Sequence, residues 1–162
     1  MQDDPIEELQ ALIERLWART GLGNCVQIAR SRQDDGSAHV EVVVDRYDLV
    51  ITERGNDLDR IAGLSVSDAA RWFLMGMAER HAQKAELQNR VAPEDASPLL
   101  SGIDDDGYSR WNWMAPAIET MSRISPQLGD WMIQEYEVVL RRAPLADYER
   151  RNARYPLPPA FK

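Results

Sequence analysis

The sequence predicts an α+β fold in which a small antiparallel meander sheet of about four strands is covered by a layer of helices. Residues 25–62 alternate apolar and polar side chains between turn signals, as half-covered strands do. Helical apolar spacing precedes this region at 5–19 and follows it at 66–90 and beyond 110. The 162 residues are 44% hydrophobic and 28% charged, which is the balance of a globular domain with a sizeable core.

The first element is a helix from Pro5 to Arg19. Proline suits the first helical turn, where its missing N–H costs nothing, and Glu7 and Glu8 complement the helix dipole. Apolar residues recur at helical spacing and predict a core-facing stripe: Ile6, Leu9, Ile13, Leu16 and Trp17.

Four segments follow with the pattern of strands: Cys25–Arg32, Ala38–Asp45, Tyr47–Thr52 and Leu58–Ala62. Asp34-Asp35-Gly36-Ser37 predicts a hairpin turn between the first two, because Gly and Asp tolerate positive φ. The alternation places His39 on the solvent face, where we expect an ordinary titrating surface residue. Glu53 and Arg54, before the turn signal Gly55-Asn56, are interpreted as a cross-strand charge pair at the sheet end, with a catalytic role as the weaker alternative.

The next helix, capped by Ser67 and ending near Arg90, should cover the apolar side of the sheet. Glu86 and Arg90 have the i, i+4 spacing of an ion pair, which is typical of a solvated helix face. Two further helices are predicted at Arg110–Ile124 and from Ser125-Pro126, an N-cap followed by a first-position proline, to Arg141-Arg142. We therefore predict one domain over residues 1–146 and a loosely packed, Pro-rich C-terminal tail over 147–162.

Between these helices lies a long acidic segment, residues 91–107, rich in Pro, Ser, Gly and Asp. Loops of this length in compact domains tend to be functional or disordered. Asp104-Asp105-Asp106-Gly107 is suggestive of calcium, but the alternating ligands and terminal Glu of an EF-hand loop are missing. An exposed acidic contact loop is the preferred interpretation, with disorder or a plain connection as alternatives.

Composition limits the function classes. A net charge of −8 opposes binding to nucleic acid and suits a basic partner, although acidity also serves solubility alone. A single cysteine, Cys25, and two distant histidines, His39 and His81, favour neither a disulfide nor a zinc site. No apolar run is long enough for a membrane span, and the acidic start Met1-Gln2-Asp3-Asp4 is unlike a secretory signal. We therefore expect a cytoplasmic protein with no metal, no cofactor and no membrane contact, and with its oligomeric state open.

The order of motifs resembles the immunity protein 63 family of bacterial polymorphic toxin systems. The resemblance rests on a strand ending Glu53-Arg54-Gly55, a helix ending with Ala82, Glu86, Leu87 and Arg90, then Ile124-Ser125-Pro126, Trp131 and Leu140-Arg141-Arg142-Ala143-Pro144. It covers residues 47–144 and departs from the family at 91–107, where we expect a much shorter connection, and in the tail after Pro144. It implies an α+β protein without enzymatic activity that binds and neutralises a toxin in the cytoplasm of the producing cell.

Two sets of residues follow from this comparison. Interfaces combine aromatic anchors with charged rims, which makes toxin-contact candidates of Glu94, Asp95, Asp104, Asp105, Asp106, Tyr108 and Trp111. The family motif residues are expected to hold the fold: Glu53, Arg54, Gly55, Glu86 and Arg90. A basic toxin such as a nuclease, blocked by occlusion, is the preferred partner. The alternatives are a small acid–base enzyme using Glu53, Arg54 and His81 or His39, and a general protein-interaction adaptor.

Overall fold

The computed structural model describes residues 4–94, 99 and 102–162. The chain divides into two compact units, residues 1–77 and 78–162, which are described separately. The helix α2 (Val66–Asn89) begins in the first unit and ends in the second. The α+β class predicted from the sequence is confirmed.

The first unit begins with the predicted helix, α1 (Pro5–Trp17), which continues into a 3₁₀ turn, η1 (Ala18–Thr20). Asp4 caps α1, because its carboxylate accepts a hydrogen bond from the Ile6 N–H at 2.9 Å. The buried side chains of the helix are Leu9, Ile13 and Trp17, as the apolar stripe predicts. Gly21 ends the segment in the left-handed conformation, with φ 71°.

The sheet has three strands in the order β1 (Asp35–Val43), β2 (Arg46–Glu53) and β3 (Asn56–Leu64). Both pairs are antiparallel and joined by two-residue turns, so the meander is confirmed with one strand fewer than predicted. The segment Cys25–Arg32 is not a regular strand. It meets the sheet through one isolated bridge, between Ala29 and His39, and that bridge is parallel. A tight hairpin can join only antiparallel strands, so the turn predicted at residues 34–37 was wrong, and Asp35–Ser37 belong to β1 instead.

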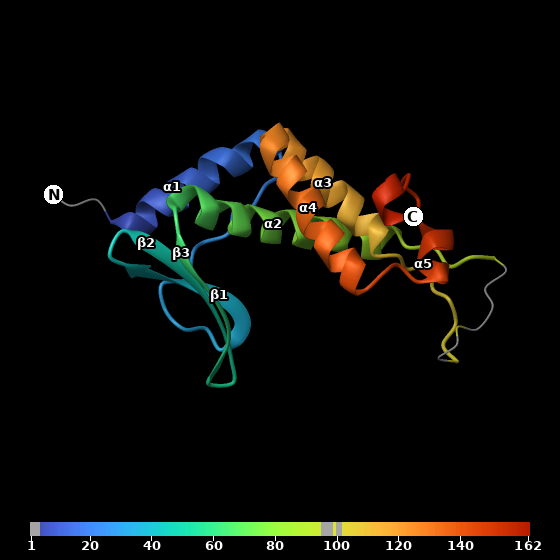
Figure 1. Ribbon diagram of the computed structural model, residues 1–162, viewed down its shortest axis with the longest axis horizontal. Coiled ribbons are helices and arrows are strands. Elements are labelled where there is room, and N and C mark those ends of the chain that lie inside the picture. Colours follow the sequence, from blue (N-terminus) through green and yellow to red (C-terminus); the bar gives the residue numbers. More distant parts are fainter. Residues whose placement is uncertain (1–3, 95–98, 100–101) are drawn as a thin grey trace. The chain divides into compact units, whose positions relative to one another are not determined.

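The sequence predicted a sheet with one face in solvent, but the central strand is covered on both faces. Tyr47, Asp48, Leu49 and Val50 are all buried, so the central strand β2 is enclosed on both faces. The Tyr47 hydroxyl donates to the Pro5 carbonyl of α1 at 2.8 Å, and α1 and the first half of α2 lie on one side of the sheet (Figure 1). His39 is only 5% exposed, and its prediction as a surface residue was wrong because the segment before β1 pairs beside it.

The second unit is helical in its described part: the end of α2, then α3 (Trp111–Ile124), α4 (Pro126–Arg142), α5 (Asp147–Asn152) and the 3₁₀ turn η2 (Pro159–Phe161). Ser125 caps α4 through a 3.2 Å bond from the Leu128 N–H, and Pro126 follows it, as predicted. The cap of α2 is Ser65, whose hydroxyl accepts from the Asp68 N–H at 3.1 Å, and not Ser67. The helices α3 and α4 approach so closely that a Cβ on Gly129 would lie 2.0 Å from the Ser122 hydroxyl oxygen.

The C-terminal segment is not a loosely packed tail. Phe161 is 7% exposed, and its ring meets Trp111 of α3 edge-to-face at 5.3 Å between centroids. The indole N–H of Trp111 donates to the Pro156 carbonyl at 3.2 Å, and the Asn112 side chain bonds the backbone at both Asn152 and Arg154. Residues 147–162 are therefore tied to α3, and Glu149 and Phe161 join the buried residues of the second unit, although Pro156 and Pro159 are exposed.

Candidate functional site

The family motif residues Glu86 and Arg90 form the centre of the most organised polar cluster in the loop region. The guanidinium of Arg90 donates to both carboxylate oxygens of Glu86, at 2.9 and 2.8 Å. The Glu86 side chain is only 2% exposed and that of Arg90 is 21% exposed. The prediction of a solvated helix face was therefore wrong for this pair: the spacing identified the partners, but burial makes the pair part of the core.

Arg90 also binds the far end of the acidic loop. Its third contact is with Asp106, at 2.7 Å, and its guanidinium lies over the Tyr108 ring, 4.8 Å from the centroid. A cation above an aromatic face adds attraction to that of the ion pair. We call Glu86, Arg90, Asp106 and Tyr108 the latch, because they join the C-terminal end of α2 to the residues just before α3.

Backbone packing closes the loop at the same place. Gly107 has φ +87°, and a Cβ built on it would lie 2.1 Å from the carbonyl oxygen of Val91. Only glycine permits both the left-handed conformation and this close approach. The two ends of the 91–107 segment therefore touch, and the segment is a closed loop rather than an open linker.

The structure separates the seven predicted contact candidates into three groups. Glu94, Asp104 and Asp106 are exposed and Tyr108 is half-buried. Asp105 and Trp111 are buried, at 5% and 2% exposure, so neither side chain is available at the surface. Asp95 lies outside the described residues. The structure thus brings Asp106 and Tyr108 together with the motif residues, which the sequence had assigned to a separate, structural set.

Asp105 is held by the segment that follows α4. Its carboxylate accepts from the Gly107 N–H at 2.9 Å and from the Asn152 side chain of α5 at 2.8 Å. The neighbouring Asp106 bonds the Tyr108 N–H at 3.0 Å. Partial burial raises the pKa of the Asp106 carboxyl, but the bonds from Tyr108 and Arg90 outweigh it, and the pKa is lowered. Adjacent aspartates thus have different roles: Asp105 anchors the loop inside, and Asp106 presents charge outside.

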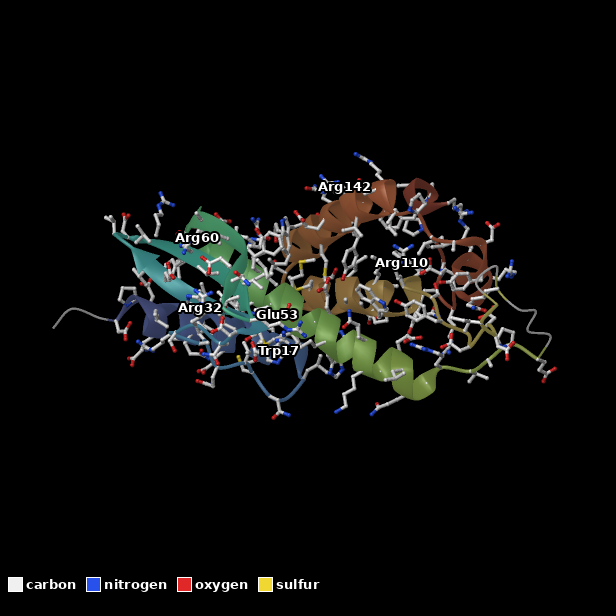
Figure 2. The ribbon with its side chains drawn as sticks, turned by 90° about the horizontal axis from the view of Figure 1, so that it is seen from below. Trp17, Arg32, Glu53, Arg60, Arg110 and Arg142 are labelled. Carbon is white, nitrogen blue, oxygen red and sulfur yellow. The ribbon has the colours of Figure 1, made fainter. Side chains whose placement is uncertain are left out.

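A second arginine–carboxylate pair was missed by the sequence analysis. Arg110, just before α3, donates through Nε and Nη2 to the two carboxylate oxygens of Glu149 in α5, at 2.8 and 2.9 Å. Its remaining donors bind the carbonyls of Ala143 and Pro144 at 2.8 and 2.7 Å. Arg110 therefore lies where α3, the end of α4 and α5 come together (Figure 2).

Glu149 is also a helix cap. It accepts from the Ala146 N–H at 2.9 Å, which is the reach of a third-position Glu back to the start of its own helix. Burial acts to raise the pKa of the Glu149 carboxyl, but the hydrogen bonds from Arg110 and from the Ala146 N–H lower it overall. The sequence carries no cap signal here, because Ala146 stands where a capping box has Ser or Thr, and the pairing of Glu149 with Arg110, 39 residues away, leaves no local pattern either.

Among the described residues around the closed loop, three large apolar side chains are exposed. Leu87, Val91 and Ile103 are 65%, 74% and 67% exposed. Leu87 and Val91 flank the latch residue Arg90 along the chain, and Ile103 lies on the returning part of the loop, where its carbonyl accepts from the Leu99 N–H at 2.9 Å. We call these three the apolar trio. The sequence analysis did not select them, although Leu87 belongs to the family motif.

The other motif residues, Glu53, Arg54 and Gly55, lie in the β2–β3 turn of the first unit. Arg54 and Gly55 both have positive φ, 49° and 81°, as a type I′ hairpin requires. Arg54 is therefore in the turn and not opposite Glu53, and the cross-strand pairing predicted for them was wrong. The turn is held by Asp34, whose carboxylate accepts from the Gly55 N–H at 3.2 Å.

Among the described residues of the first unit, Glu53, Arg54 and His39 are not brought together as an acid–base site would require. The Arg54 side chain is 90% exposed and lies 3.9 Å from Glu53. His39 contacts Glu41 at 3.1 Å, and that carboxylate also binds Arg60, which in turn binds Asp48 at 2.9 Å. Figure 2 shows Arg60 and Arg32 over the sheet. The histidine therefore belongs to an ion-pair network on the sheet and has no contact with the Glu53–Arg54 turn among the described bonds.

Two absences apply to the described residues. In residues 4–94, 99 and 102–162, no group of three His, Cys, Asp or Glu side chains is placed to hold a metal ion. Within the same ranges, no helix has the length and apolar character needed to cross a membrane.

Comparison with known proteins identifies the class. The family model of Immunity protein 63 matches residues 44–138, more than half of the chain, and the chain belongs to this family. No curated protein and no solved structure matches the chain. Its function is therefore in immunity, with a toxin as the partner that the family implies.

Proposed function

We propose that the protein binds one cognate toxin domain tightly and blocks it by occlusion. The observation that carries this proposal is the match of the immunity family over residues 44–138, which contain the meander turn, the latch and the helices α3 and most of α4. The cognate toxin belongs to a polymorphic toxin system and is neutralised in the cytoplasm of the cell that makes it. In this proposal the protein performs no chemistry of its own.

The contact region we propose is the closed loop and its latch. Tight interfaces use preorganised surfaces, because ordering a loop on binding costs free energy. The Arg90 bonds to Asp106 and the contact of Gly107 with Val91 hold the loop ends in place before any partner arrives. The exposed acids Glu94, Asp104 and Asp106, with the half-buried Tyr108, are the members of the predicted set that can touch a partner.

The partner we propose is a basic toxin domain such as a nuclease. The chain carries a net charge of −8, and opposite charges accelerate the encounter of two proteins. An acidic surface can also occupy the site in which a nuclease holds the phosphate backbone. This predicts association whose rate falls as salt is added.

Growth rescue tests the proposal. The toxin domain encoded beside this gene is expressed alone, with the wild-type protein, and with an unrelated immunity protein as the control. Rescue by the wild-type protein alone, together with a one-to-one complex between it and an inactive toxin variant, is the expected result. Continued growth arrest and no complex in titration calorimetry would overturn the proposal.

A further inference from the structure

The apolar trio is unusual because three large apolar side chains are exposed at or next to an acidic loop. Leu87, Val91 and Ile103 expose 65%, 74% and 67% of their surfaces; the first two lie where the 91–107 loop begins, and Ile103 lies on its returning part, next to Asp104. Single exposed apolar residues are common on proteins, but several around one structured feature indicate an interaction site.

The latch fixes where two of these side chains stand. Leu87 follows Glu86, which is 6% exposed and bound by Arg90, so the last turn of α2 is held at this point. Val91 follows Arg90, and its carbonyl lies directly beneath Gly107. Both backbones are thus fixed while both side chains remain in solvent. An apolar side chain on a fixed backbone has only its own rotamer freedom to lose on binding, which suits an interface anchor.

Acidic side chains surround the trio along the chain. Glu94 follows Val91 within the loop, Asp104 follows Ile103, and the Asp106 side chain is 61% exposed beside Arg90. An apolar centre with a charged rim is the usual anatomy of a specific protein interface. The rim is negative on the side of the loop, whereas Lys84, three residues before Leu87 in α2, is an exposed positive charge.

We infer that Leu87 and Val91, with Ile103, are the anchor of the toxin interface. The occupant is a toxin surface with an apolar depression bordered by Lys or Arg side chains, which would meet Glu94, Asp104 and Asp106. This inference rests on the proposed function and adds to it the residues that supply most of the affinity. It also separates two roles: the apolar trio determines how long the complex lasts, and the acids determine how fast it forms.

The degree of exposure and the neighbouring acids select this surface over another apolar one in the same unit. Val138 and Val139 of α4 are 45% and 44% exposed, less than Leu87 and Val91. Glu137 precedes them and pairs with Arg141 at 3.6 Å, so charges of both signs border this pair. It therefore supplies a control of exposed apolar residues in the same unit without an acidic border.

The experiment compares two double variants of the full chain, L87S/V91S and V138S/V139S, against an inactive variant of the toxin domain encoded beside the gene. Because all four side chains are exposed, both variants should keep the thermal unfolding midpoint of the wild type within a few degrees. Surface plasmon resonance then gives association and dissociation rates. We expect L87S/V91S to raise the Kd at least tenfold, mainly through faster dissociation, and V138S/V139S to change it less than twofold.

A third variant, E94Q/D104N, tests the rim. It should slow association and reduce its salt dependence, with a smaller change in the dissociation rate. If the wild type binds and L87S/V91S leaves the Kd within twofold, the anchor assignment is wrong while the immunity function stands. If V138S/V139S weakens binding more than L87S/V91S, the interface lies on α4 and the inference is overturned. If the wild type itself does not bind, the proposed function fails and this inference with it.

Discussion

Two arginine–carboxylate pairs in the second unit have nearly the same local geometry and different consequences. Arg90 binds Glu86 and Arg110 binds Glu149, each through two bonds of 2.8–2.9 Å, and each arginine is 21% exposed above a carboxylate that is 2–3% exposed. The first pair joins residues four apart, from the last turn of α2 to the residue just after it, and the second joins residues 39 apart. The local pair has a spare donor for the loop acid Asp106, whereas the long-range pair uses its spare donors on backbone carbonyls.

The remaining contacts of each arginine indicate that the two pairs have different roles. A pair whose remaining contacts are backbone atoms can only hold helices together. A pair whose remaining contact is an exposed side chain also controls what the surface presents. Arg110–Glu149 should therefore matter mostly for the folded state, and Glu86–Arg90 for both the folded state and the loop.

The largest effect should come from Glu149→Ala. Removing the carboxylate leaves Arg110 short of an acceptor and removes the partner of the Ala146 and Arg110 backbone N–H groups. Breaking a buried pair from one side typically costs about 3–5 kcal/mol of unfolding free energy. Urea unfolding of the full chain measures it.

Asp147→Ala is the control for this variant, because Asp147 lies in the same helix and its side chain is 86% exposed beside Arg150. It should change the unfolding free energy by less than about 1 kcal/mol. Equal stabilities of the two variants would contradict the structural role of Arg110–Glu149.

Glu86→Ala should cost less, about 1–3 kcal/mol, because Arg90 keeps Asp106 and some access to water. Its matched control is Glu119→Ala, which removes an i, i+4 pair with Arg123 where both side chains are more than half exposed. That control should stay within about 0.5 kcal/mol of the wild type. A result in which both variants behave alike would mean that burial adds nothing to the Glu86–Arg90 pair.

Acid titration should separate Glu149 from another carboxyl of the same unit. The pKa of Glu149 is lowered in the folded protein, so its contribution is present at neutral pH and is lost as the pH falls below its ordinary value of about 4.3. Burial raises the pKa of Glu79, despite a 3.0 Å bond from the Tyr136 hydroxyl, so its contribution is greatest at low pH and falls as the pH rises. Relative to wild type, Glu149→Gln should lose stability as the pH rises from about 2 to about 5, whereas Glu79→Gln should gain it as the pH rises from about 4 to about 7. Unfolding midpoints across these two ranges check both signs.

The smallest effect on global stability should come from Asp106→Ala, because the Asp106 side chain is 61% exposed. Its consequence is local: the Tyr108 N–H loses its acceptor and should exchange with solvent deuterium several-fold faster. The Gly107 N–H, which donates to Asp105, serves as the internal control in the same hydrogen-exchange experiment. A uniform change at both amides would show that the two aspartates are not separate in function.

The sequence predicted those features whose cause lies within a few residues. Pro5, Ser125 and Pro126 marked helix starts because caps and first-turn prolines act locally. The i, i+4 spacing of Glu86 and Arg90 identified partners but not their burial, because the spacing does not show that Asp106 and Tyr108 pack against Arg90. The four-strand prediction failed at Cys25–Arg32 because alternation says nothing about the direction from which a segment approaches the sheet.

The sequence also predicted some residues of the candidate site correctly and others wrongly. Asp106 and Tyr108 were selected for charge and aromaticity, and both lie in the latch. Asp105 and Trp111 were selected on the same grounds but are buried, because Asn152 and Phe161 from the C-terminal segment cover them. Contacts between residues more than 40 positions apart leave no trace in composition or spacing, and these contacts decide which acid faces solvent.

Glu149 lies beyond the stretch that defines the family, since the match ends at residue 138, while its partner Arg110 lies inside it. A chimera that exchanges only the family stretch between two immunity proteins would therefore separate an arginine from its counter-ion. Grafts intended to move toxin specificity from one scaffold to another should carry the C-terminal segment with them. The family match ends at residue 138, but the structure of the second unit depends on residues after that point, at least to Glu149.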